Sequence, residues 1–375
     1  MSMSLERSNA LTGMMRTLEE GGFDRVDPPI LQPAEVFLDL SGEELRRRLF
    51  QVQDPAGREL CLRPDMTIPV SRHHLGTGDP LRAADYCYLG PVFRHRPGSD
   101  EPDEFMQAGI ESFGTEDYAA ADARIVALGV TAARGLGAQN LTLKIGDPTL
   151  LLGFVAALDV PAAWQRRLRS AFGTEGGVKG MLKNAGEEAA GSAAYASALA
   201  RLDPQAARSL VSEMVDIAGI ASVGGRSADE IAERLIERAS LSGGNALDDG
   251  TRELITRFMD IDALPEDAMA EISTLAEEAD IDAAPALEAF AARLDAMSQV
   301  GIDAANIRFS ASFGRRLDYY SGFVFEASAP NIAAGPVVAG GRYDALLELL
   351  GAPQPVPGVG CAIWIDRAFA AGGSR

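Results

Sequence analysis

The chain has 375 residues, of which 47% are hydrophobic and 23% are charged, and this composition is ordinary for a globular protein. Asp and Glu outnumber Lys and Arg by 54 to 34, and the resulting net charge of −20 argues against a protein that binds the phosphates of RNA or DNA. There is no run of 18 apolar residues and no N-terminal signal pattern, so we expect no membrane span and a cytoplasmic location.

The first third of the chain predicts a mixture of helices and strands. Residues 5–20 suit an amphipathic helix that ends at a Gly-Gly pair, and residues 28–37 begin with two prolines and suggest an extended segment. Residues 50–64 predict a β-hairpin, because strand-like runs flank an Asp-Pro-Ala-Gly turn at 54–57. Alternating or apolar runs predict further strands at 86–93, 107–113 and 141–146.

Residues 149–301 have a different character, being rich in alanine, helical in periodicity and poor in strand signals. Ser227 and Glu230 form a capping-box pattern that predicts the start of a helix. Another helix is predicted from an apolar stripe followed by a glycine, at Leu287, Phe290, Leu294, Met297 and Gly301. We interpret the region as a helical insertion, with linker-like glycine pairs at 224–225 and 243–244.

The strand pattern returns near the C-terminal end, where hydrophobic residues alternate over 307–313 and again over 323–325. Antiparallel strands that are interrupted by helices and then resume predict an α+β fold. We therefore expect one sheet domain formed by residues 1–148 and 302–375, with residues 149–301 inserted between its two parts.

Few cysteine and histidine side chains are available for a metal site or a nucleophilic triad. The cysteines lie far apart in apolar contexts, and we expect all three to be buried and structural: Cys61, Cys87 and Cys361. The histidines are also only three, at His73, His74 and His95. We expect no metal and no cofactor.

Four segments place charged or hydrogen-bonding residues between apolar strand positions: 62–72, 88–114, 313–326 and 339–367. Taken singly, each has a structural explanation, such as a common turn or a pair of packed tyrosines. In order and spacing, however, they resemble histidyl-tRNA synthetase and its paralogue, the regulatory subunit of ATP phosphoribosyltransferase, over nearly the whole chain. The second and fourth segments resemble motifs 2 and 3 of class II synthetases, and the third resembles the histidine-recognition motif.

This resemblance implies a class II synthetase-like antiparallel sheet with flanking helices, and it implies a histidine site. Asp65, Thr67 and Gln107 would hold the ammonium group of the amino acid. Arg315, or Arg315 together with Arg94, would hold its carboxylate, because a guanidinium presents a fork of donors to a planar acceptor.

The same resemblance assigns the imidazole side chain of the ligand to Glu111 and Tyr320. Tyr319 belongs to the same motif, but we expect it to lie on the opposite face of a strand and to pack in the core. All of these residue types match the motif, so the histidine site is expected to be usable.

The nucleotide side departs from the synthetase pattern. Motif 2 of the synthetases reads Arg-x-Glu before a basic loop, whereas here the Glu is missing and the chain passes directly to Arg96-Pro97. The loop that follows is acidic, at Asp100, Glu101, Asp103 and Glu104. Like charges near a phosphate oppose its binding.

Motif 3 also departs from the pattern. Arg367 remains available to stack on adenine, but Trp364 stands where a glycine is expected. Its indole would fill the space of the base, or it would turn into the core. The chain ends eight residues after Arg367, and we expect no anticodon-binding domain.

We therefore expect a non-catalytic regulatory subunit of ATP phosphoribosyltransferase that binds histidine as a feedback sensor in histidine biosynthesis. The resemblance implies a short catalytic subunit as partner and a self-dimer within a hetero-octamer. Two alternatives stay open. Arg94, Arg315 and Arg367 favour an amino-acid-activating enzyme with an acceptor other than tRNA, and a pure scaffold with a vestigial pocket is the other.

Overall fold

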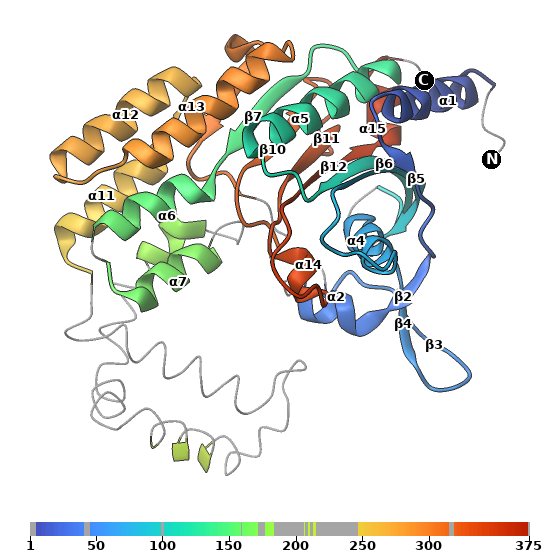
Figure 1. Cartoon of the computed structure of the whole chain (residues 1–375), viewed down its shortest axis with the longest axis horizontal. Helices are drawn as coiled ribbons and strands as arrows, with labels where there is room; N and C mark the ends of the chain where they lie inside the picture. The colour runs from blue at the N-terminus through green and yellow to red at the C-terminus, as the bar shows by residue number, and fades with distance from the viewer. Residues whose placement is uncertain are drawn as a thin grey trace.

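A computed structural model describes residues 5–40, 46–98, 101–158, 160–171, 177–183, 206, 209–210, 213–214, 247–314 and 319–373. A nine-stranded sheet forms its centre (Figure 1). In spatial order its strands are β1 (Asp24–Arg25), β5 (Ala84–Phe93), β6 (Glu104–Phe113), β12 (Gly358–Trp364), β11 (Val338–Arg342), β10 (Val324–Ser328), β7 (Thr142–Gly146), β9 (Ile307–Ser310) and β8 (Asp262–Ala263). The β1–β5 and β7–β9 pairs are parallel and all other pairs are antiparallel, which confirms the α+β prediction.

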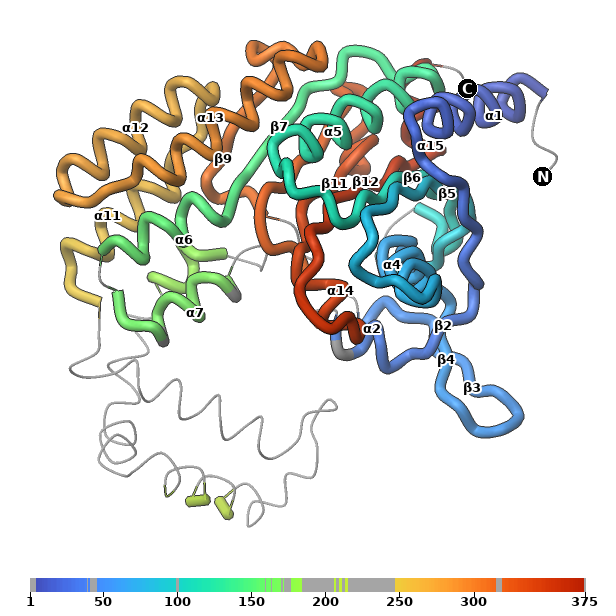
Figure 2. Tube along the Cα trace, viewed as in Figure 1, coloured from blue at the N-terminus to red at the C-terminus, as the bar shows by residue number. Residues whose placement is uncertain are grey.

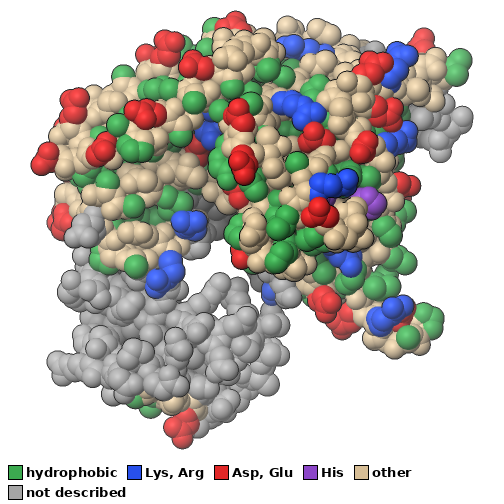
Figure 3. Space-filling view, in the orientation of Figure 1, with side chains coloured by type: hydrophobic (Ala, Val, Ile, Leu, Met, Phe, Trp, Pro, Cys, Tyr) green, Lys and Arg blue, Asp and Glu red, His purple; other side chains and the backbone are tan. Residues whose placement is uncertain are grey.

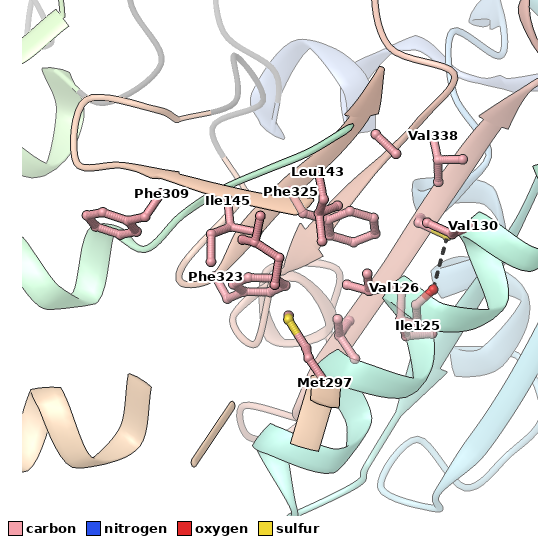
Figure 4. Packing of buried hydrophobic residues seen from close by; sticks show 14 of the residues in the cluster. Ile125, Val126, Val130, Leu143, Ile145, Met297, Phe309, Phe323, Phe325 and Val338 are labelled. Carbon is pink, nitrogen blue, oxygen red and sulfur yellow. Dashed lines mark hydrogen bonds between the residues drawn. The ribbon is translucent and has the colours of Figure 1, made fainter. Parts of the chain in front are cut away.

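One face of the sheet packs against helices. They are α5 (Tyr118–Gly135), α13 (Ala284–Gln299), α1 (Leu5–Glu20) and α15 (Ile365–Ala371). Figure 4 shows Leu143, Ile145, Phe323, Phe325 and Val338 of the sheet region facing Ile125, Val126 and Val130 of α5 and Met297 of α13. Helices α1 and α15 lie side by side (Figure 2), and the Arg7 guanidinium carbon lies 4.5 Å from the Phe369 ring centre.

The opposite face of the sheet carries a second, smaller core. It is covered by α4 (Thr67–Leu75), α14 (Leu346–Leu349), α2 (Ala34–Leu40) and a three-stranded sheet of β2 (Leu31–Pro33), β4 (Glu59–Leu62) and β3 (Gln51–Gln53). The polar residues singled out by the sequence lie on this face.

The described part of residues 149–301 packs on the same structure. It contains α6 (Pro148–Ala157), α7 (Ala162–Ala171), α11 (Asp249–Asp260) and α12 (Pro265–Glu278), and a short 3₁₀ helix follows at Ala304–Asn306. Helix α13 packs along α5, and β8 extends the sheet beyond β9. Acidic and basic side chains are interspersed on the face in Figure 3, and acidic ones predominate over α12 and α13.

Several local predictions are confirmed. The first helix spans Leu5–Glu20, the hairpin forms from β3 and β4, and the strands predicted at 86–93, 107–113 and 141–146 are β5, β6 and β7. The apolar stripe of 287–297 faces the core in α13, where Phe290 and Met297 are buried. All three cysteines are buried.

Two local predictions are wrong in part. The extended segment expected to reach residue 37 gives way to helix α2 at Ala34, because Ala34 and Phe37 have helical spacing and both are buried in the smaller core. The strand expected over 307–313 ends at Ser310, where the chain turns and the amide of Phe313 donates to the carbonyl of Ser310 at 3.0 Å. The capping box at Ser227 and the glycine pairs at 224–225 and 243–244 lie outside the described residues.

Within the part of the chain that the structure describes, no helix is long and apolar enough to cross a membrane. The same residues contain no group of three or more His, Cys, Asp or Glu side chains placed to hold a metal ion.

Candidate functional site

Strand pairing places the candidate residues of β6 on one face of the sheet. Gln107 and Glu111 are four residues apart, and alternate residues of a strand point to the same face. On the neighbouring strand β12, Trp364 is in register with Gln107 and Gly360 is in register with Glu111. Helix α4, which begins at Thr67, covers this face.

Glu111 is fully buried and lies at the centre of a cluster of hydroxyl groups. Thr67 Oγ1 donates to Glu111 Oε1 at 2.8 Å, Tyr88 Oη donates to the same oxygen at 3.3 Å, and Tyr343 Oη donates to Oε2. The pKa of Glu111 is raised to about 8, chiefly by burial and in smaller part by the Asp65 carboxylate, while the hydroxyl donors of Tyr343, Thr67 and Tyr88 act in the opposite direction.

Two glycines let this cluster lie directly on the sheet. A Cβ atom at Gly360 would lie 1.7 Å from Glu111 Oε2, and one at Gly109 would lie 2.3 Å from Tyr88 Oη. Any side chain at either position would therefore displace a group of the cluster. Gly360 of motif 3 thus leaves room for the carboxylate of Glu111.

Asp65 and Gln107 carry buried polar atoms that form no hydrogen bond with any of the described residues. Asp65 Oδ1 accepts from the Ile68 amide at 3.2 Å, whereas Oδ2 has no hydrogen-bond partner, and neither does either polar atom of the Gln107 amide. Burial raises the pKa of Asp65, and the Arg94 guanidinium opposes that rise. Because buried polar groups are nearly always paired in proteins, these three atoms lack the partners that burial normally requires.

Tyr319 and Tyr320 both border this cluster, which corrects the expectation that Tyr319 lies on the opposite face. Their ring centres are 5.0 Å apart and lie 5.8 Å and 6.2 Å from the ring of Tyr343. The Tyr319 hydroxyl interacts with Thr67. Residues 319 and 320 are not part of a strand, so the alternation of strand faces does not separate them.

Of the two arginines assigned to the ligand carboxylate, the structure describes only Arg94. Arg94 Nε donates to the carbonyl of Pro64 at 2.5 Å, beside Asp65, and the guanidinium lies 5.7 Å from the Phe105 ring centre. Arg94 therefore borders the unpartnered atoms. Arg315 lies outside the described residues.

Tyr88 and Tyr343 were not predicted as site residues, although both bond to Glu111. Tyr88 is opposite Gly109 in the β5–β6 register, and strand alternation alone would have placed it on the Glu111 face. Tyr343 comes directly after β11, which is not a sequence neighbour of β6, so no local signal indicates its contact with Glu111.

On the motif 2 and motif 3 side of the face, side chains of the chain itself contact one another. The Trp364 indole is buried in the smaller core, on the face that carries Gln107, and the Arg367 guanidinium lies 5.2 Å from its ring centre. Of the acidic loop, Glu101 forms an ion pair with Arg367, and Asp103 accepts from the backbone amide of Arg96 at 2.9 Å. Glu104 is exposed at the start of β6, and Asp100 lies outside the described residues.

Comparison with known proteins relates this arrangement to two groups. The family model described as Histidyl-tRNA synthetase matches residues 3–215 and 178–368. A protein of Brucella anthropi named ATP phosphoribosyltransferase regulatory subunit is 39% identical over 377 residues, which is 96% of each chain. A protein of the same name from Rhizobium rhizogenes is 40% identical over 350 residues, which is 92% of each chain.

Solved structures share the fold at low sequence identity. A structure from Bacillus halodurans, described as an ATP phosphoribosyltransferase regulatory subunit/histidyl-tRNA synthetase, has a TM-score of 0.65 and 22% identity and covers 97% of this chain and 78% of its own. The histidyl-tRNA synthetase of Nostoc sp. PCC 7120 has a TM-score of 0.62 and 16% identity and covers 97% of this chain and 70% of its own. The class II synthetase-like fold expected from the motifs is therefore confirmed.

Proposed function

Because this chain belongs to the family of ATP phosphoribosyltransferase regulatory subunits, which share the histidyl-tRNA synthetase fold, we propose that it senses histidine and transmits that signal to a separate catalytic subunit. It is a regulatory subunit of an enzyme and not a catalytic one. The observation that carries the sensing role is the group of unpartnered buried atoms on Asp65 and Gln107 beside Glu111.

The charge of the site favours a ligand with a cationic group. Asp65 and Glu111 are both buried, and burial raises the pKa of each because a buried carboxylate loses its hydration. An ammonium group bound to Asp65 Oδ2 and to the Gln107 amide oxygen would satisfy both acceptors and stabilise the ionised forms of the two acids. Thr67 lies within the same cluster and completes the proposed ammonium subsite.

The Glu111 carboxylate and the tyrosine rings around it suit a ligand whose side chain is planar and carries ring N–H donors. A carboxylate has about four acceptor sites, and three hydroxyl donors occupy Glu111, which leaves one for an imidazole. The rings of Tyr319, Tyr320 and Tyr343 pack around the same place. We assign the ligand carboxylate to Arg94 and Arg315, whose charge would complement it.

The same subunit is proposed not to activate the amino acid. Activation needs ATP beside the bound histidine, but the Trp364 indole and the Glu101–Arg367 ion pair occupy the motif 2 and motif 3 side of the face. We propose a short catalytic subunit as partner, a self-dimer within a hetero-octamer, a cytoplasmic location, and no binding of nucleic acid, the last in keeping with the net charge of −20.

Histidine is expected to bind the isolated chain saturably, and Asp65→Asn is expected to weaken that binding. Loss of a hydrogen bond to a charged group costs about 1.5–3 kcal/mol, which is about 10- to 150-fold in the dissociation constant. Isothermal titration calorimetry measures the change. Asp295→Asn on the exposed side of α13 is the matched control and should bind as the unchanged protein does. Equal affinities for the two variants would contradict the pocket.

In the assembled enzyme, histidine is expected to change catalytic activity through this subunit. Linkage requires histidine to prefer one state of the complex, and coupling energies of about 1–3 kcal/mol correspond to changes of about 5- to 150-fold. Asp65→Asn and Arg315→Ala should desensitise the complex while it still assembles, which activity assays and size-exclusion chromatography together test. Unchanged inhibition by a complex whose regulatory subunit no longer binds histidine would place the effector site elsewhere.

A further inference from the structure

Arg63 is a buried arginine that lies two residues before Asp65, and only 1% of its surface is exposed. Its Nε donates to the carbonyl of Pro91 at 2.9 Å, and its Nη1 donates to the carbonyl of Pro28. Both acceptors belong to the main chain, and no carboxylate among the described residues hydrogen-bonds to Arg63. Burial lowers the pKa of Arg63, because a buried cation without a carboxylate partner is costly. An apolar residue would avoid this cost, so the guanidinium indicates a requirement for its donors.

The guanidinium completes an edge of β5 that strand pairing leaves open. Strand β1 pairs with β5 at Tyr86 and Cys87, and the last residues of β5 have no partner on that side among the described strands. Pro91 has no N–H, which prevents a regular ladder at this edge. Arg63 bonds to the edge twice, because its Nε reaches the Pro91 carbonyl and its own carbonyl accepts from the Phe93 amide at 3.0 Å.

The opposite side of Arg63 is fastened to the segment that precedes β2. The Arg63 amide donates to the carbonyl of Ile30 at 2.9 Å, and Nη1 bonds to Pro28 of the same segment. Asp65 follows two residues later, and its Oδ2 has no partner that would hold it in place. The position of the Asp65 carboxylate therefore depends on the bonds that hold the backbone at Arg63.

The guanidinium also borders Gln107. In the β5–β6 register Gly90 is the partner of Gln107, and the side chains of paired residues point to the same face of a sheet. A Cβ atom at Gly90 would lie 2.4 Å from Arg63 Nη2, so the guanidinium takes the space that a side chain opposite Gln107 would fill. One buried group thus supports the backbone that leads to Asp65 and lies beside Gln107.

We propose that Arg63 is a positioning residue of the ammonium subsite, and that by bridging Pro28 and Pro91 it holds Asp65 and Gln107 where one ammonium group can bind both. Arg63 itself does not contact the ligand, because its described hydrogen bonds go to the main chain of the protein. A guanidinium suits this role, since its fixed fork of donors reaches two carbonyls from different segments. The proposal rests on the proposed histidine site and assigns it a further residue.

The test is a double-variant cycle in which calorimetry measures histidine binding to the unchanged protein, Arg63→Met, Asp65→Asn and the variant with both changes. Methionine keeps an unbranched apolar stem but removes the donors. Arg63→Met should bind histidine about 10- to 100-fold more weakly, the range expected when hydrogen bonds to a charged group are lost. In the Asp65→Asn background the same change should cost little more, because Arg63 acts through a carboxylate that is already absent.

The matched control is Arg58→Met, which removes an arginine from the turn of the β3–β4 hairpin, where its side chain is 77% exposed. It should bind histidine as the unchanged protein does. The proposal is overturned when folded Arg63→Met binds with unchanged affinity, or when its loss is equally large with and without Asp65. Failure of the unchanged protein to bind histidine would instead contradict the proposed function and remove this proposal with it.

Gly90→Ala provides the second variant and serves should Arg63→Met not fold. It keeps every polar group of Arg63, but its Cβ would push the guanidinium away from its acceptors. It should weaken histidine binding in the same direction, and again much less in the Asp65→Asn background. Unchanged affinity in a folded Gly90→Ala chain would likewise contradict the proposal.

Discussion

Replacement of Asp122 by alanine is expected to lower the free energy of unfolding by about 3–5 kcal/mol. Asp122 is fully buried in α5. Its Oδ2 accepts from Arg293 Nε of α13 at 2.8 Å, and its Oδ1 accepts from Arg342 Nη2 of β11 at 2.6 Å. Removing the carboxylate leaves two buried guanidinium groups without their shared partner, and that cost exceeds the value of an ordinary ion pair.

The network around Asp122 joins three parts of the fold. Arg293 Nη1 also donates to Asp147, the residue that caps α6, at 2.6 Å. Arg342 Nη1 donates to Asp344 at 2.9 Å, and Tyr343, which bonds to Glu111, lies between these two residues. The loss of Asp122 should therefore loosen α13 and α6 from the sheet and disturb the end of β11 that borders the site.

Urea unfolding of the purified chain measures this effect. The control is Glu278→Ala, because Glu278 forms an ion pair with Arg257 at 2.5 Å in which both side chains are 45% exposed, and exposed pairs contribute little. The control should unfold at the same urea concentration as the unchanged protein. A similar small change in both variants would show that the Asp122 network is not a main source of stability.

The stability of the ligand-free protein is expected to fall as the pH rises from about 5 to about 8 because of Glu111. Its pKa is about 8 in the folded protein, against a usual value of 4.5, so between these values the folded state holds a proton that the unfolded state has lost. The stabilising contribution is complete below pH 4.5 and disappears as the pH rises through 8. Its size is on the order of 3–5 kcal/mol, since each pKa unit corresponds to about 1.4 kcal/mol.

Glu111→Gln should remove most of this pH dependence, because glutamine does not titrate. Denaturant unfolding of both proteins at pH 5, 6, 7 and 8 gives the difference curve. Burial lowers the pKa of His74, which acts in the opposite sense, but His74 is present in both proteins and cancels in the difference. Burial raises the pKa of Asp65, which contributes a slope of the same sign, but Asp65 is likewise present in both proteins. Parallel curves for the two proteins would count against a protonated Glu111.

Much of the fold could be read from local sequence patterns. The helix at 5–20, the hairpin with its Asp-Pro-Ala-Gly turn and the core stripe of α13 were all predicted, because hydrophobic period and turn chemistry act over a few residues. The same patterns misplaced the end of β9 and the start of α2, where contacts with other elements decide the boundary. Element types were therefore more predictable than their ends.

The candidate site was predictable by residue type and motif order, but not by contact. Asp65, Thr67, Gln107 and Glu111 match the motif and meet on one face of the sheet. The error at Tyr319 came from applying strand alternation to a segment that is not a strand. Strand alternation does apply to Tyr88, because the β5–β6 register places it opposite Gly109, on the face that carries Glu111.

By itself, the sequence determined the types of element, the face that each strand residue takes and the acidic character of the motif 2 loop. Only the tertiary structure decided which distant residues meet. Its sheet order places β12, the last strand, between β6 and β11, and this brings Gly360 beside Glu111, Trp364 beside Gln107 and Arg367 within reach of Glu101. The physical reason is that periodicity encodes the direction of a side chain relative to its own backbone, whereas contacts between residues more than 200 positions apart depend on how the whole sheet is ordered.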